Sequence, residues 1–367
     1  MPSPLATATP SMRDRAVDMI TMTATPSVHA EPAPAGVERK TPPRRKITRW
    51  VRPFAWIVMG FLMLGLIGAA YQEVSTRQDL RMLPAPGQLV DVGSHRLHID
   101  CIGHGSPAVI LEAGNLGMSA DWIKIQQQVA GTTRVCSYDR AGMGWSEAGP
   151  PPRDASRISA ELHTLLTRAG VAPPYVMVGH SYGGLYALRY AGKYPEDVAG
   201  LVLLDSSHPD QFTRSAEGRA VFRHTSRLGA VLPQLTRLGI VRLTNFLPAH
   251  PDVPPLQRAQ VQAFNSTTRQ VTTSVAEFRP TPESSAQAAS TTSINDKPLA
   301  VVTAGEQNAE WLQMQDELLA LSPNSIHRVA AGATHASLMF TDRDAAVSSA
   351  AINQVVQAVR AHRPLRP

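Results

Sequence analysis

The sequence predicts an α/β protein with a mostly parallel sheet, preceded by a helix that can span a membrane. Three observations lead to this prediction. From residue 88 onward, short apolar runs alternate with stretches of helical periodicity, which is typical of a sheet covered by helices. One apolar run enters the turn Gly179-His180-Ser181-Tyr182-Gly183. An uninterrupted apolar run also extends from Phe54 to Tyr71.

Length and composition are those of a globular protein with a large core. The 367 residues include 35 Lys and Arg and 29 Asp and Glu, but the excess of positive charge is local. It gathers just before the apolar run, at Lys40, Arg44, Arg45, Lys46, Arg49 and Arg52. A cluster in this place indicates membrane topology. No basic stripe interleaved with aromatic residues follows, so we expect no nucleic-acid partner.

The N-terminal residues are predicted to form a tail and a membrane anchor. Residues 1–52 are rich in Pro, Ala, Thr and Ser before the basic cluster, so we expect a disordered basic tail. Residues 53–72 hold the apolar run, whose length of about 18 residues just suffices for a transmembrane helix. The upstream cations would hold the N-terminus in the cytoplasm, which makes a single-pass protein with an extracytoplasmic catalytic domain.

A signal peptide is the alternative interpretation of the apolar run. Gly68-Ala69-Ala70 could form its cleavage site, but its charged region would be unusually long. We therefore favour an uncleaved anchor. Residues 73–87 are predicted to be a polar linker.

The first strands of the predicted sheet follow this linker. Residues 89–101 alternate around Gly93-Ser94 and predict a hairpin. Residues 108–112 form a buried strand that runs into the glycine-containing loop 113–122. Such a loop, at the carboxyl edge of a strand, is where an open sheet places ligand groups. The strand 134–139 is followed by a turn in which we interpret Asp139 and Arg140 as structural.

The central strand of the prediction leads to the serine. Tyr175–Val178 form a buried strand, and a helical pattern begins just after Gly183. A turn this tight strains the backbone of Ser181 and directs its hydroxyl out of the sheet. Because the following helix begins there, its free N–H groups can stabilise an oxyanion. An amphipathic helix over 155–169 precedes this unit.

The remaining chain is predicted to finish the sheet around an insertion. The strand 198–205 ends in the carboxylate of Asp205, and residues 210–295 show helical spacing broken by prolines. We expect the insertion to be a helical cap over the site. Strands over 298–305 and 326–331, with helices over 311–321 and 345–359, follow. The predicted core therefore comprises residues 88–209 and 296–367.

The strand, the one-residue turn and the helix around Gly-x-Ser-x-Gly make the chain resemble the α/β-hydrolase superfamily over about residues 88–360. The turn from Asp139 to Ser146 is similar to that family's Asp-x-x-Gly-x-Gly-x-Ser turn. The resemblance implies a mostly parallel eight-stranded sheet with helices on both faces and an inserted helical cap. It also places the strands of Cys101 and Cys136 side by side, where the two cysteines could form a disulfide or remain thiols.

The resemblance also implies an oxyanion hole made of backbone N–H groups. Tyr182 supplies one of them, and the loop after residue 112 supplies the other. The matching residue in that loop is Asn115, or Leu116 if the loop is read one residue longer. The family often has His-Gly where this chain has Ala113-Gly114. Because the donor is a backbone group, this departure does not remove it.

A serine nucleophile needs a base, and we predict that His335 is this base. It lies on a loop after the last strand, as the chain order serine, acid, histidine requires. The acid that orients the histidine is less defined. The family's usual position falls on Asn308, which cannot carry the charge. We predict Asp205, at the end of the preceding strand, with Glu306 as the alternative acid.

These residues predict a membrane-anchored serine hydrolase that cleaves a small ester-like substrate through an acyl-enzyme. No metal or organic cofactor is expected, and the sequence is silent on oligomeric state. An aspartate at position 181 would have indicated dehalogenase or epoxide hydrolase chemistry. The alternatives are a peptidase or a C–C bond hydrolase on the same fold, or a non-catalytic binding protein of this fold.

Overall fold

The computed structural model describes Gly36 and residues 48–366 of the chain. Most of the tail predicted over residues 1–52 therefore lies outside the described residues. Residues 54–367 form one unit and residues 1–53 another. The description below concerns the larger unit, apart from the first residues of the helix that joins the two.

Eight strands form a single sheet. Their bounds are β1 Gln88–Asp91, β2 Arg96–Ile102, β3 Ala108–Glu112, β4 Val135–Tyr138, β5 Tyr175–His180, β6 Val198–Leu204, β7 Leu299–Ala304 and β8 Ser325–Ala330. The spatial order is β1-β2-β4-β3-β5-β6-β7-β8. The pairs β1–β2 and β2–β4 are antiparallel, and all other pairs are parallel. The predicted eight-stranded, mostly parallel sheet is confirmed.

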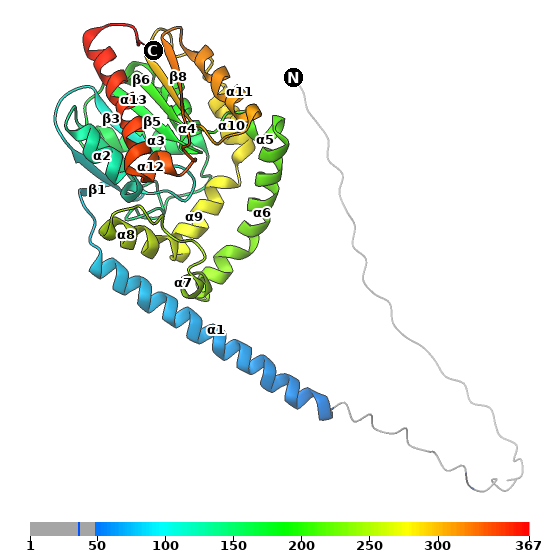
Figure 1. Cartoon of the computed structure of the whole chain (residues 1–367). Helices are drawn as coiled ribbons and strands as arrows, with labels where there is room; N and C mark the ends of the chain where they lie inside the picture. The colour runs from blue at the N-terminus through cyan, green and yellow to red at the C-terminus, as the bar shows by residue number, and fades with distance from the viewer. Residues whose placement is uncertain (1–35, 37–47, 367) are drawn as a thin grey trace, which may run out of the picture. The chain divides into compact units, whose positions relative to one another are not determined.

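Helices cover both faces of this sheet, because the strands are apolar on both sides. Val176 and Val178 pack with α2 (Ile123–Ala130) and α13 (Asp342–Ala361). Tyr175 and Met177, which point to the other side, pack with α3 (Ala155–Arg168) and α4 (Gly183–Lys193). Figure 1 shows the sheet between these two layers. Short helices η1 (Ser119–Trp122), η2 (Pro195–Asp197), η3 (Leu318–Leu321), α11 (Ala309–Glu317) and α12 (Ser337–Phe340) complete the domain.

The chain between β6 and β7 forms helices without any strand, as the sequence predicted. They are α5 (Gln211–Arg214), α6 (Ala216–Arg237), α7 (Ile240–Thr244), α8 (Pro255–Asn265), α9 (Thr268–Phe278) and α10 (Thr281–Ala289). We call residues 210–295 the cap. Its long helix α6 runs from α5 down to α7, beside α9 (Figure 1).

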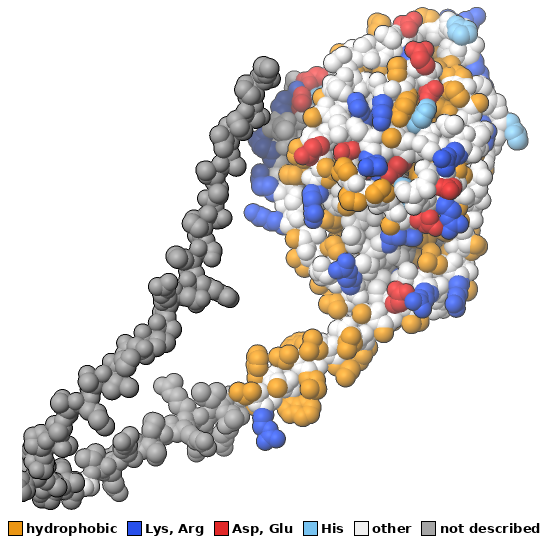
Figure 2. Space-filling view, turned by 180° about the vertical axis from the view of Figure 1, so that it is seen from behind, with side chains coloured by type: hydrophobic (Ala, Val, Ile, Leu, Met, Phe, Trp, Pro, Cys, Tyr) orange, Lys and Arg blue, Asp and Glu red, His pale blue; other side chains and the backbone are white. Residues whose placement is uncertain are grey.

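The helix α1 (Thr48–Met82) is longer than the predicted transmembrane segment. A linker was predicted over residues 73–87, but residues 73–82 continue the helix. They contain no glycine or proline, and Arg77 and Glu73 form an i,i+4 ion pair at 2.8 Å. The helix ends just before Pro84, which cannot extend it. Apolar side chains surround the helix along most of its length (Figure 2).

Cys101 and Cys136 are joined by a disulfide. The two residues lie opposite each other on the antiparallel strands β2 and β4. The sequence left open whether these cysteines are bonded or remain thiols, and the structure has the bonded form. The described residues contain no free cysteine.

Candidate active site

Ser181 lies on the sharp turn between β5 and α4. Its φ is 56°, in the left-handed region where a residue with a Cβ is strained. The turn is held on both sides, because the N–H of Ser181 donates to Leu204 O at 3.2 Å and its carbonyl accepts from Ser207 N at 2.9 Å. The strained conformation predicted for this serine is present.

Two glycines permit this turn by allowing backbones to approach closely. A Cβ on Gly179 would lie 2.7 Å from the Cα of Gly184, at the start of α4. A Cβ on Gly183 would overlap the carbonyl oxygens of Glu112 and Ala113 at the end of β3. Larger residues at these positions would therefore push α4 away from the sheet and move Ser181.

Asp205 and His335 meet at the end of the sheet. Asp205 follows β6, and His335 lies on the loop between β8 and α12. The Nδ1 atom of His335 lies 2.5 Å from Oδ2 of Asp205. The carboxylate is fully buried, whereas the imidazole is 40% exposed. One ring nitrogen is thus bonded to the acid. No hydrogen bond joins the other, Nε2, to Ser181 Oγ, but both side chains line the same two cavities.

The charge of Asp205 is stabilised by several donors. Its Oδ1 accepts hydrogen bonds from the Trp311 indole at 2.9 Å and from Ala304 N at 3.2 Å. Its Oδ2 also accepts from the Gln307 amide at 2.5 Å. Burial alone would raise the pKa of this carboxyl, but His335 and the other donors hold it below its ordinary value. Asp205 is therefore ionised at neutral pH and can stabilise an imidazolium.

The sequence did not indicate the parts that Gln307 and Trp311 play here. The only signal was their position just after β7, on the loop and helix that the family uses for its acid. Glu306 lies on the same loop, but its backbone N–H donates to Ala333 O, and no hydrogen bond joins its carboxylate to His335. Asn308 caps α11 by accepting from Trp311 N at 2.9 Å.

His180 supports His335 from the side. Its Nε2 donates to the backbone oxygen of His335 at 3.2 Å, and the two ring centroids are 4.7 Å apart. Burial, together with the charge of His335, lowers the pKa of His180 to about 3. His180 is therefore a neutral donor, which leaves His335 as the exposed imidazole beside Asp205.

The loop after β3 lies against Ser181. A Cβ on Gly114 would stand 3.1 Å from the Cβ of Ser181 and 3.5 Å from its Oγ. The next residue, Asn115, bonds to the cap through its side chain, with its Oδ1 2.8 Å from Ser274 Oγ and its Nδ2 3.1 Å from Ser274 O. Leu116 has a φ of 65°. The loop is therefore held from the cap helix α9, beside Ser181.

Arg140 ties this loop to the sheet and to the cap. Its guanidinium is buried and donates to Ala113 O at 2.6 Å, Gly114 O at 2.8 Å, Glu112 Oε1 at 2.8 Å and Glu277 Oε2 at 3.0 Å. Burial raises the pKa of Glu112 to about 7, although Arg140 opposes this shift. The sequence predicted a structural, turn-fixing role for both Asp139 and Arg140; the bonds of Arg140 extend that structural role to the cap.

Asp139 shapes the neighbouring turn. It accepts from Ser119 N at 2.7 Å and from Trp145 N at 3.0 Å, and it pairs with the buried His98 at 2.9 Å. These bonds fix the backbone on both sides of the turn that carries Arg140. Asp139 thus contributes to the site only by positioning.

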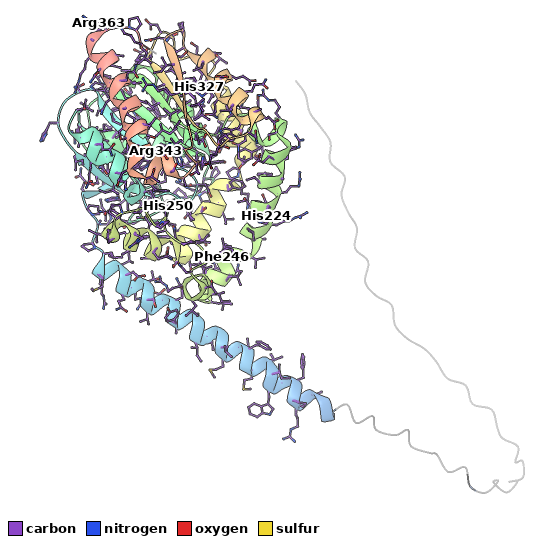
Figure 3. All side chains as sticks on the ribbon, viewed as in Figure 1. His224, Phe246, His250, His327, Arg343 and Arg363 are labelled. Carbon is purple, nitrogen blue, oxygen red and sulfur yellow. A yellow bond between two sulfur atoms is a disulfide. The ribbon has the colours of Figure 1, made fainter. Side chains whose placement is uncertain are left out.

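Two cavities meet at Ser181 and His335. One of about 420 Å³ is also lined by Asn115, His250 and Phe340. His250 of the cap (Figure 3) stacks on Phe340 of the sheet domain, with ring centroids 4.9 Å apart. The other, of about 280 Å³, has a mixed lining in which polar side chains such as Gln307 stand beside Val221 and Met314. A carbonyl at Ser181 would have space on both sides. Among the described residues, no three His, Cys, Asp or Glu side chains are placed to hold a metal ion.

Comparisons with known proteins support the fold. Residues 107–342 match the family described as alpha/beta hydrolase fold. A thermophilic esterase from Thermogutta terrifontis is similar over 75% of this chain and 99% of its own, with 20% identity and a TM-score of 0.57. The haloalkane dehalogenase DatA from Agrobacterium tumefaciens C58 is similar over 74% of this chain and 96% of its own, with 17% identity and a TM-score of 0.59.

Similarity to curated sequences is partial. An uncharacterized vacuolar membrane protein of Saccharomyces cerevisiae is 23% identical over 211 residues, which cover 49% of this chain and 33% of that protein. The chain spans half or less of the length of the curated relatives it matches. These relatives therefore indicate no substrate for this chain.

Replacement of Asp205 by Asn is expected to lower the turnover of an activated ester by about 10³–10⁴-fold, because an amide neither fixes the imidazole tautomer nor stabilises the imidazolium. Glu306→Gln, which removes a carboxylate from the nearby loop, is the matched control and should keep near wild-type turnover. Steady-state kinetics and thermal melts of both variants test this. The reverse pattern would assign the acid to Glu306.

Replacement of Arg140 by Lys is expected to destabilise the protein by about 3–5 kcal/mol, because a single ammonium cannot satisfy two buried carboxylates and two carbonyls. Arg96→Lys is the control, since the Arg96–Glu147 pair is exposed and such pairs contribute about 1 kcal/mol or less. Urea unfolding measures both. Equal unfolding midpoints would show that Arg140 does not link cap and core.

Proposed function

Because the chain belongs to the α/β hydrolase fold family, we propose that it is a membrane-anchored serine hydrolase that cleaves an ester-like carbonyl substrate through an acyl-enzyme. The nucleophile position favours this chemistry over that of the dehalogenase to which the fold is similar. A serine hydroxyl needs an adjacent base before it can attack, and an aspartate would not. His335 stands in the place of such a base.

One observation carries the proposal. The imidazole of His335 is held by a buried carboxylate on one side and lines the same two cavities as Ser181 on the other. A histidine with a purely structural role would need neither a carboxylate that accepts four hydrogen bonds nor access to a cavity. The combination of an oriented, half-exposed imidazole and a strained serine supports nucleophilic catalysis.

The proposed reaction proceeds in two steps. Ser181 Oγ attacks the substrate carbonyl while Nε2 of His335 takes the hydroxyl proton. The negative oxygen is stabilised by the N–H groups of Tyr182 and Asn115 and by the positive end of α4. His335 then gives the proton to the leaving alcohol. A water molecule, deprotonated by His335, hydrolyses the acyl-enzyme and regenerates Ser181.

Two features support an extracytoplasmic catalytic domain on a membrane anchor. One helix in the described chain, Val51–Met82, is long and apolar enough to cross a bilayer. The basic cluster before it would remain in the cytoplasm. The Cys101–Cys136 disulfide favours an oxidising compartment for the domain that follows.

A fluorophosphonate probe is expected to label the folded wild-type protein covalently, because an activated serine attacks phosphorus as it attacks a carbonyl. Ser181→Ala should abolish this labelling while its thermal unfolding stays unchanged. Ser207→Ala, which changes another serine beside the cavity, is the control and should remain reactive. Gel fluorescence measures all three.

Other outcomes would favour other functions. A folded protein that the probe does not label would be a binding protein of this fold. A labelled protein that hydrolyses amides or C–C bonds but no esters would be a peptidase or a C–C bond hydrolase.

A reporter enzyme that is active only outside the cytoplasm should be active when fused after Pro367 and inactive when residues 1–72 are deleted from the same fusion. The reason is that the cationic flank retains the N-terminus inside. Colony assays of reporter activity distinguish the two. An active reporter in the deleted fusion would contradict the anchor, and an inactive full-length fusion would contradict the topology.

A further inference from the structure

The apolar end of α1 packs against the corner where α6 meets α7. Gly65 and Gly68 are three residues apart and face the same side of the helix. A Cβ on Gly65 would lie 3.6 Å from the side chain of Leu238, and one on Gly68 would overlap the Leu238 carbonyl. A Cβ on Gly239 would lie 3.0 Å from the ring of Tyr71. The two small residues therefore let the corner approach the helix backbone.

Polar contacts beyond the apolar run fix α1 on the cap. Gln72 Nε2 donates to Ser266 O at 2.7 Å, in a buried contact. Arg242 of α7 pairs with Asp79 at 2.6 Å. These bonds lie within the three helical turns that follow Tyr71. The last part of the anchor helix is thus a structural element of the cap and not a flexible tether.

This packing sets the height of the corner relative to a membrane. Gly65 and Gly68 lie about 9 Å and 5 Å before Tyr71 along the helix, at 1.5 Å per residue. Tyr71 ends the apolar run, so a bilayer that contains this run reaches the level of Leu238. The α6–α7 corner is therefore at the membrane surface if the run spans the bilayer.

The cap exposes apolar side chains along α6 and at its corner with α7. Outside α1, seven of the ten large apolar side chains exposed in the described chain lie between residues 221 and 246. They are Val221, Leu228, Val231, Leu238, Ile240, Leu243 and Phe246. Leu243 is 67% exposed and Phe246 53%, and Figure 3 shows Phe246 at the end of the cap nearest α1. Such a concentration is typical of a surface that contacts a partner or a membrane.

The charges of the same segment fit an anionic bilayer. Residues 211–246 contain six arginines and one acidic residue, Glu217. Arg214 and Arg242 are paired with carboxylates. The others are Arg219, Arg223, Arg227 and Arg237, all on α6. Apolar and cationic side chains on one helix are characteristic of helices that lie in the membrane interface.

An apolar cavity leads from this corner to the candidate site. It has about 360 Å³ and is lined by α6, α9 and the segment just after α7, with Phe222, Leu232 and Phe278 among its walls. Leu228, in α6, and Phe246, just after α7, belong both to its lining and to these exposed side chains. At its inner end it reaches Asn115 and Leu116 of the loop beside Ser181. Such a lining suits a hydrocarbon chain and offers little to a polar substrate.

We propose that the α6–α7 corner rests in the bilayer surface and that the cavity receives the hydrocarbon chain of an ester lipid drawn directly from the membrane. This inference rests on the proposed hydrolase function and gives it a substrate class. The lipid would leave the bilayer at Leu228 and Phe246 and bring its ester to Ser181. The cavity of mixed lining on the other side of Ser181 would take the polar part of the lipid.

The cavity is tested by blocking its mouth in the full-length protein, reconstituted in vesicles of phosphatidylglycerol and phosphatidylcholine. Leu228→Trp is expected to lower kcat/KM for p-nitrophenyl palmitate by about tenfold or more, because the chain loses its pocket, and to leave p-nitrophenyl acetate turnover unchanged. Ser226→Trp changes a second exposed residue that lines the cavity. The same result from both variants would show that the effect does not come from a folding defect caused by one substitution. Equal effects of both variants on the two esters, or no effect, would overturn the cavity assignment.

The proposed membrane contact of the α6–α7 corner is tested with the double variant Val231→Glu/Leu243→Glu, which places two negative charges on this surface. Its KM for the palmitate ester in anionic vesicles should rise while acetate turnover stays at the wild-type value. Val329→Glu, at a 50% exposed position on β8, is the matched control and should change neither. If the corner variant alters only the oligomeric state and leaves palmitate turnover intact, the corner is a contact between copies and the proposal is wrong.

Different results would contradict the hydrolase function and the membrane-lipid substrate. Wild-type protein that hydrolyses neither ester and is not labelled by a fluorophosphonate would contradict the hydrolase function itself. Wild-type protein that is labelled and cleaves the acetate ester, but prefers it to the palmitate ester in vesicles, would contradict only the membrane-lipid substrate.

Discussion

The candidate site depends on one buried charge, the carboxylate of Asp205. Burial opposes ionisation of this group, and it is ionised only because four donors converge on it. These donors come from the end of β7, the loop after it, the first turn of α11 and the loop after β8. The charge therefore holds together the segments around Ser181 as well as orienting His335. An acid on a mobile loop could not both orient His335 and hold these segments together.

A second buried charge joins the cap to the sheet. Arg140 bonds to both carbonyls that precede Asn115 and to Glu277 on α9, while Ser274 of the same helix bonds to the Asn115 side chain. The backbone donors proposed for the oxyanion are thus positioned by the cap, not by the sheet alone. A shift of α9 would therefore move the loop beside Ser181, which makes the cap part of the geometry of the candidate site.

The same cap is bound to α1 through Gly65, Gly68, Gln72 and Asp79. Continuous packing therefore extends from the apolar helix through α6 and α9 to the loop beside Ser181. In its proposed role as a membrane anchor, a helix attached in this way does more than localise a domain. This attachment fixes the position and orientation of the cap relative to the helix. The opening of the apolar cavity therefore has a defined position relative to a membrane that contains the helix.

Sequence patterns alone determined the eight strands, the helical insertion and the serine turn, because apolar periodicity and glycine spacing act between residues that are neighbours in the chain. They left open what depends on distant partners. Asp205 and Glu306 were both candidate acids, and the one that meets His335 is 130 residues away from it. Arg140 looked like a turn residue because Glu277 is 137 residues away. The linker after residue 72 proved helical where the cap packs on it. Only the tertiary structure decided these points, since the order of the strands and the docking of the cap choose which distant side chains share a buried space.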